Sequence, residues 1–216
     1  MDKRQKSSTT RIGSVIGGLI CLFALVGCAT TDERRFPVDY ISGLRAAYSV
    51  ETAREALPAY LRMGADLERQ GRFAAAAVAY SNAVESALAL GRLQDALDAS
   101  QKAVAMAERS GNADHLAPAL ARLGHTYASL GARDKAIPVF ERGAQAAKRA
   151  GNSQPEASCH SGLAFIYRSL GNREKALEHS QIAVEIMRAN SFVATADPRM
   201  RWQMQALEHL DRNYAH

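Results

Sequence analysis

The sequence predicts an all-α protein, a superhelical solenoid of antiparallel helix hairpins that ends in a capping helix. Between glycines spaced by twenty residues lie stretches rich in Ala, Leu, Glu, Lys and Arg, each as long as a helix of about five turns. Only 6% of the residues are aromatic while 47% are hydrophobic, which is typical of a helical core built from Ala and Leu. The spaced glycines are Gly71, Gly91, Gly111, Gly131, Gly151 and Gly171.

Residues 1–27 have the pattern of a secretory signal peptide and are not expected to belong to the fold. The first eleven residues are cationic, and residues 12–27 form an uncharged apolar run that ends in small residues. The sequence Leu25-Val26-Gly27-Cys28 resembles the lipobox of bacterial lipoproteins. This resemblance implies lipidation of the Cys28 thiol, cleavage before Cys28 and acylation of the new amino terminus. Two or more acyl chains would hold the protein stably on a bilayer.

Two alternatives to the lipid anchor stay open. Residues 12–31 carry no charge and could span a bilayer as an uncleaved helix, because about 20 residues suffice for that. The segment could also be an ordinary cleaved signal. Four glycines shorten its apolar core, which favours the lipoprotein. Ala29 follows Cys28 where Asp would resemble an inner-membrane signal, so the resemblance implies the periplasmic face of the outer membrane in a Gram-negative host.

The segment between the anchor and the repeats divides into two parts. Residues 28–39 are polar, contain Pro37 and show no helical period, so they are expected to form a tether. Residues 40–56 are expected to form an N-terminal helical segment. The repeat domain is expected to cover residues 57–190.

The repeat is forty residues long, because alternate glycine turns differ in sequence. Hairpins are predicted over residues 72–110, 112–150 and 152–190. The helix expected at 72–90 could instead be the second helix of a hairpin over 57–90, so the phase of the first hairpins stays open.

Turn and cap residues define where each helix starts and stops. A glycine just past a helix end adopts positive φ without a Cβ clash, so the ladder marks helix C-termini. Helix N-termini are expected at residues that can cap them, namely Asp95, Asp114, Asp134 and Ser153. Prolines are expected in first turns at Pro118, Pro138 and Pro155.

The final segment, residues 191–216, is predicted to contain the capping helix. Ser191 stands where the next glycine would fall, and Asp197-Pro198 can open a helix to about residue 213. Trp202, Met204 and Leu207 are expected to cover the last hairpin, as the end of a repeat array requires.

The order of large and small residues in each unit resembles that of tetratricopeptide repeats. Residues 117–150 have, in sequence, Leu120, Leu123-Gly124, Tyr127, Gly131, Ala136, Phe140 and Gly143. The next unit repeats this order as Leu163-Ala164, Tyr167, Gly171, Ala176 and Ala183, and an earlier copy has Tyr60, Met63-Gly64, Leu67, Gly71, Ala76, Tyr80 and Ala83. Ser100 and Ser180 depart from the pattern, since an aromatic residue is expected there. The resemblance covers about residues 55–190 and implies a stack of helix hairpins.

The resemblance also implies a concave face that binds partner peptides, lined by the first helix of each hairpin. The family's groove positions fall on Ser81, Asn82, Glu85, Arg122, His125, Ser129, Ser161, Phe165 and Arg168. Arg122, His125, Phe165 and Arg168 are the strongest candidates, because an aromatic ring among cations could bind an acidic peptide.

The net charge of +5 does not predict a nucleic-acid partner. Residues 1–27 carry four basic side chains and one acidic one, so three of the five charges lie in the signal. In the rest of the chain both signs are interspersed, which is typical of a solvated surface.

No motif predicts catalysis, a metal or a cofactor. The six histidines show no HExxH-type spacing, and no glycine-rich phosphate loop or GxSxG is present. Cys159 and His160 are a nucleophile and a base in sequence, but adjacent residues of a helix point about 100° apart. An enzyme would need His125 and His160 to meet carboxylates on the concave face.

The sequence therefore predicts a non-enzymatic lipoprotein scaffold of the bacterial envelope. Its repeats are expected to bind partner proteins and to support assembly of a secretion, pilus or cell-wall complex. The alternative is an adaptor that recruits and regulates an envelope protease or peptidoglycan hydrolase.

Overall fold

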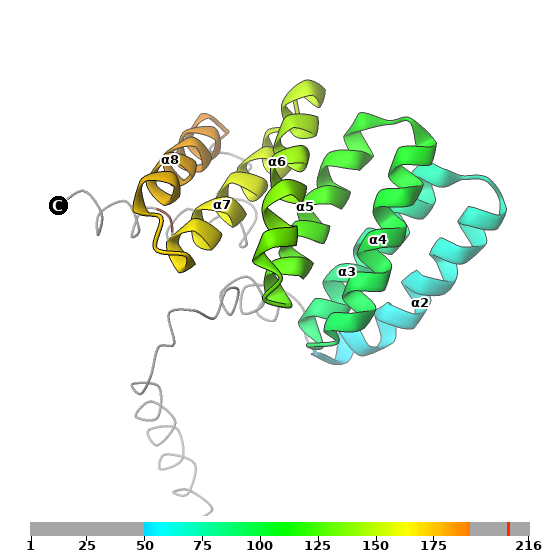
Figure 1. Ribbon diagram of the computed structural model, residues 1–216. Helices are drawn as coiled ribbons and strands as arrows, with labels where there is room; N and C mark the ends of the chain where they lie inside the picture. Colours follow the sequence, from blue (N-terminus) through cyan, green and yellow to red (C-terminus); the bar gives the residue numbers. More distant parts are fainter. Residues whose placement is uncertain (1–49, 191–206, 208–216) are drawn as a thin grey trace, which may run out of the picture. The chain divides into compact units, whose positions relative to one another are not determined.

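The computed structural model describes residues 50–190 and Leu207 (Figure 1). The chain divides into two units, Met1–Glu33 and Arg34–His216, and every described residue belongs to the second. The described residues form helices joined by short turns and contain no strand. These helices are α2 (Val50–Arg69), α3 (Phe73–Ala89), α4 (Leu93–Ser110), α5 (Ala113–Ser129), α6 (Arg133–Ala150), α7 (Ser153–Ser169) and α8 (Arg173–Ala189).

The six glycines of the ladder all have the left-handed backbone expected of them, with φ between 65° and 75°. Gly111 shows the reason: it is the C-cap of α4, and its N–H donates to the Glu108 carbonyl. A side chain at that φ would be strained, whereas glycine is not. The predicted helix C-termini are therefore confirmed.

The helix N-termini differ from the prediction. Asn112 caps α5 by accepting a hydrogen bond from the Asp114 N–H at 2.8 Å, and Asn172 caps α8 in the same way from Lys175 at 3.1 Å. The Asp side chains expected as caps lie one to two residues inside the helices, where their charge favours the positive end of the helix dipole. Ser153 is the first residue of α7, after Asn152 at the N-cap position.

Two of the three prolines also lie deeper than expected. Pro118 and Pro138 are each the sixth residue of their helix, beyond the first turn, while Pro155 lies in the first turn of α7. A proline at the sixth position removes one backbone hydrogen bond near the helix start, where the ladder has only begun.

Consecutive helices pack against one another along the whole described array, and alternate helices also contact each other. α3 contacts α5, and α5 contacts α7 (Figure 1). The three helices therefore form one layer, as the first helices of three successive hairpins do. The hairpins are α3–α4, α5–α6 and α7–α8.

The α2 helix explains why the sequence left open whether the helix at 72–90 pairs with the helix before it or the one after it. A Cβ built on Gly64 would lie 2.7 Å from the Tyr80 ring, so α2 and α3 approach each other as closely as two helices of one hairpin do. α3 thus has a close neighbour on both sides, α2 and α4. The boundary expected between residues 56 and 57 lies inside α2, which is continuous from Val50 to Arg69.

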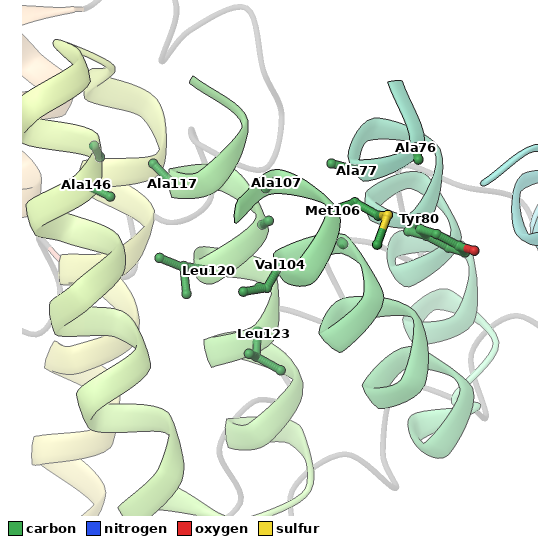
Figure 2. Close-up of a cluster of buried hydrophobic side chains, with 13 residues drawn as sticks. Ala76, Ala77, Tyr80, Val104, Met106, Ala107, Ala117, Leu120, Leu123 and Ala146 are labelled. Carbon is green, nitrogen blue, oxygen red and sulfur yellow. The ribbon is translucent and has the colours of Figure 1, made fainter. Parts of the chain in front are cut away.

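The core is built largely from alanine with a few large side chains. One cluster, shown in Figure 2, joins side chains of α3, α4, α5 and α6, among them Tyr80, Met106 and Leu120. Another joins α5, α6, α7 and α8 around Phe140, which is fully buried. Alanine lets helix backbones approach, and the few large residues fill the remaining space.

The predicted capping helix lies outside the described residues except for Leu207. This leucine is fully buried in a cluster with Phe165, Val184 and Met187 of α7 and α8. Its burial agrees with its predicted place over the last hairpin. The predicted signal, Cys28 and the tether also lie outside the described residues, and none of the described helices has both the length and the apolarity to cross a membrane.

Candidate partner-binding face

The nine predicted groove residues all lie on the layer formed by α3, α5 and α7. Each of the three helices contributes three of them: Ser81, Asn82 and Glu85 from α3, Arg122, His125 and Ser129 from α5, and Ser161, Phe165 and Arg168 from α7. Because α5 contacts both α3 and α7, these side chains can interact across helices.

Glu85 and Arg122 form an ion pair between α3 and α5. The Arg122 Nη2 and Nε atoms donate to Glu85 Oε1 at 2.6 and 3.2 Å, and Nη1 donates to the Pro118 carbonyl at 3.3 Å. The Glu85 side chain is 7% exposed and that of Arg122 is 23% exposed. Burying a carboxylate is costly unless a cation and hydrogen bonds compensate, and Arg122 supplies both.

His125 is buried between α5 and α7. Its Nε2 lies 2.9 Å from the Ser158 hydroxyl oxygen, and its ring meets Phe140 edge to face at a centroid distance of 4.9 Å. Burial, and to a lesser extent the charge of Arg122, lowers the pKa of His125 from 6.5 to about 3. The imidazole is therefore neutral at physiological pH.

The serines of the face bond to their own helices. Ser129 donates to the His125 carbonyl and Ser161 to the Ala157 carbonyl, both at 2.8 Å. Such back-bonding to residue i−4 satisfies a hydroxyl on a helix without a partner from outside. Ser161 is buried, and Ser129 is partly exposed.

Phe165 and Arg168 lie together on α7. The Arg168 guanidinium carbon is 5.4 Å from the centre of the Phe165 ring, within the range of a cation–π contact. Phe165 is only 8% exposed, whereas Arg168 is exposed. The stacking presents a cation on an apolar base at the surface.

Exposure divides the predicted residues into two groups. Arg168 is exposed, and Asn82, Arg122 and Ser129 are partly exposed, so a partner could contact these in the described conformation. The others are buried: Ser81, Glu85, His125, Ser161 and Phe165. Their part in binding stays a prediction. In this conformation Glu85 pairs with Arg122, and the Phe165 ring packs against Arg168.

The side chain of Cys159 does not have the environment of a catalytic nucleophile. Burial raises the pKa of its thiol far above the ordinary value, and Glu156 adds to this effect. The thiolate is the reactive form, so a raised pKa suppresses reactivity. His160 contacts His179 instead. Within the described residues no group of three or more His, Cys, Asp or Glu side chains could together hold a metal ion.

The contact between His160 and His179 was not foreseen. The two Nδ1 atoms lie 3.1 Å apart between α7 and α8, and the His179 ring stacks on Tyr167. The forty-residue period could have predicted this contact. His160 stands forty residues after Leu120, and His179 stands forty residues after Val139. Aligning the hairpins by their glycines would have placed both histidines at the contact between helices.

The described region is thus an all-α repeat array whose first helices carry a layer of interacting polar side chains. A profile of the tetratricopeptide repeat matches residues 76–149 and again residues 118–189. These ranges together cover more than half of the chain, which therefore belongs to the tetratricopeptide repeat family. No curated protein matches the chain.

The family assignment defines the general role of the repeats. Tetratricopeptide repeats are in general non-catalytic modules that bind other proteins, so the repeat region is a protein-interaction scaffold. The first match begins in α3 and ends in α6, and thus comprises the α3–α4 and α5–α6 hairpins.

Proposed function

We propose that this protein is a lipid-anchored scaffold of the bacterial envelope that docks an acidic segment of a partner protein on the α3–α5–α7 layer. In a Gram-negative host the anchor holds it on the periplasmic face of the outer membrane. The docked partner is a component of a secretion, pilus or cell-wall complex.

The observation that carries the docking role is the exposed Arg168 guanidinium on the Phe165 ring. Arginine at a protein interface contributes most when it is preorganised, and stacking on an aromatic ring limits the rotamers it can adopt. Arg122, still 23% exposed, lies on the neighbouring helix of the same layer. A carboxylate-bearing segment lying across α5 and α7 would pair with Arg168 and pass beside Arg122, whose charge Glu85 already compensates.

The anchor rests on the sequence around Cys28. A thiol can accept a diacylglyceryl group, and the small Gly27 before it suits signal cleavage at this point. Incorporation of labelled palmitate into the full chain tests this part, with Cys28→Ala as the control. Equal labelling of both proteins would disprove the anchor.

The docking role is tested by photocrosslinking in native envelopes. A photoreactive phenylalanine analogue is introduced at Ser129, a partly exposed residue of the layer, so that Arg168 is kept, and in a second strain at Arg149, an exposed arginine of α6 outside the layer. We expect a discrete crosslinked partner from position 129 and none from position 149. The same crosslinks from both positions, or none from either, would contradict docking on this layer.

A further inference from the structure

The two histidines between α7 and α8 have a geometry that a simple packing contact does not require. Their Nδ1 atoms face each other at 3.1 Å, with the rings inclined by 32°. The His179 ring lies parallel to Tyr167 within 10°, which restricts its rotation. Both histidines are partly exposed, so an ion from solvent can reach them.

The repeat itself shows that histidine is not needed to join these helices. At the equivalent positions of the α5–α6 hairpin stand Leu120, which is buried in the core, and Val139, which is partly buried and packs against the same cluster. Replacing an apolar pair by two imidazoles removes apolar burial and adds the cost of desolvating polar nitrogens. The histidine pair therefore differs from the apolar residues that the preceding hairpin has at the same positions.

The Nδ1–Nδ1 separation fits two ligands of one metal ion. With metal–nitrogen bonds of about 2.0–2.1 Å, two ligands at tetrahedral or octahedral angles lie about 2.9–3.4 Å apart. We propose that His160 and His179 form a two-histidine site for a divalent transition-metal ion such as Zn²⁺ or Cu²⁺, which clamps α7 to α8. Imidazole nitrogens suit these ions, and water completes the coordination.

The surrounding charges are compatible with such a site. Burial, the neighbouring His179 and Lys148 of α6 lower the pKa of His160 to about 4. Burial also lowers the pKa of His179, Lys175 adds to this, and Glu178 and Glu141 act in the opposite direction. Both rings are thus neutral near pH 7, with lone pairs available to a metal. Without metal, one Nδ1–H donates to the other Nδ1. When the metal binds, that proton leaves Nδ1 and Nε2 of the same ring takes up a proton from solvent, so both rings stay neutral and both Nδ1 lone pairs face the ion.

The test uses the full chain without a polyhistidine tag and titrates it with ZnCl₂ or CuCl₂. The matched variant is His160→Leu with His179→Val, which installs the residues of the α5–α6 hairpin and is therefore expected to fold. His115→Ala is the control for a histidine outside the pair. Thermal unfolding gives the stabilisation, and ¹⁵N spectra of the histidines report which nitrogen is bound.

For the wild type and His115→Ala, we expect a metal-dependent rise in Tm and a shift of both Nδ1 resonances. The double variant should show no such rise, and its affinity for the metal should fall at least about tenfold. Its metal-free Tm should equal or exceed that of the wild type. An unchanged wild-type Tm in excess metal, or an equal rise in the double variant, would overturn the proposal.

Discussion

The α5–α6 and α7–α8 hairpins share the same residue spacing but fill the gap between their helices differently. In the first, Gly124 faces Phe140, and a Cβ on the glycine would lie only 2.6 Å from the ring. In the second, the equivalent pair is Ala164 and Ser180, and the buried serine donates to the Leu177 carbonyl at 3.0 Å.

The other helix contacts of the array also combine a small residue on one helix with a matching residue on the other. Gly64 of α2 faces the aromatic Tyr80, as Gly124 faces Phe140. In the α3–α4 hairpin the equivalent pair is Val84 and Ser100, both buried. Where one helix has glycine the other has an aromatic residue, and where one has Ala or Val the other has serine. At Ser100 and Ser180 the small serine thus accompanies a larger residue than glycine on the facing helix, because a close-packed contact leaves less room for the second side chain when the first is larger.

The largest expected effect comes from removing the large member of such a pair. Phe140→Ala leaves a cavity against α5 and α7, since the ring also fills the space beside Gly162. We expect the free energy of unfolding to fall by about 3–5 kcal/mol, measured by urea denaturation. Ser180→Ala in the α7–α8 hairpin should lower the free energy of unfolding far less. A comparable loss there would contradict the view that the two hairpins fill this gap differently.

The next effect comes from enlarging the small member. Gly124→Ala places a methyl group in the space of the Phe140 ring, and we expect a net loss of about 1–2 kcal/mol despite the better helix propensity of alanine. Combining Gly124→Ala with Phe140→Ser reproduces the Ala164–Ser180 pair. In the double-mutant cycle the two losses should be less than additive, and strict additivity would argue against volume compensation.

The sequence predicted features that depend on local backbone geometry better than features that depend on burial. Gly111 marks a helix end because positive φ is a property of one residue. Cap positions were off by one to three residues. Asn112 and Asp114, for example, are both able to cap, and only the folded turn selects Asn112.

The candidate face shows the same division. The forty-residue register was enough to place Arg122 and Arg168 on one layer. The burial of Glu85 and His125 depends on which helices pack over them, and no single-helix pattern contains that information. The contact between His160 and His179 needed two hairpins to be aligned with each other.

A third experiment measures how the free energy of unfolding depends on pH through His125, a residue that differs between the two hairpins. His125 stands where the α7–α8 hairpin has Phe165, and its pKa is lowered to about 3 by burial and Arg122. As pH falls from about 6.5 towards 3, the unfolded chain takes up a proton that the folded chain does not. The free energy of unfolding should therefore fall by up to about 1.4 kcal/mol per pH unit.

The variant His125→Phe isolates this contribution. It installs the residue of the other hairpin, so the difference in unfolding free energy between wild type and variant should change with pH below about 6.5 and be constant above it. Urea denaturation at several pH values measures this difference. A difference that is independent of pH from 7 to 4 would show that folding does not lower the pKa of His125.

The smallest effect on stability and the largest on binding are expected at Arg168. Its side chain is exposed and its contact with Phe165 is a cation–π interaction, so Arg168→Ala should cost about 0.5 kcal/mol of stability. If the guanidinium anchors an acidic partner, the same change should weaken binding about five- to thirtyfold. Arg149→Ala on α6 should leave binding unchanged. Envelope pull-downs with Arg168→Ala measure this. Because the variant is expected to fold normally, full retention of the partner would show that Arg168 does not contribute to recognition and that the partner does not dock on α7.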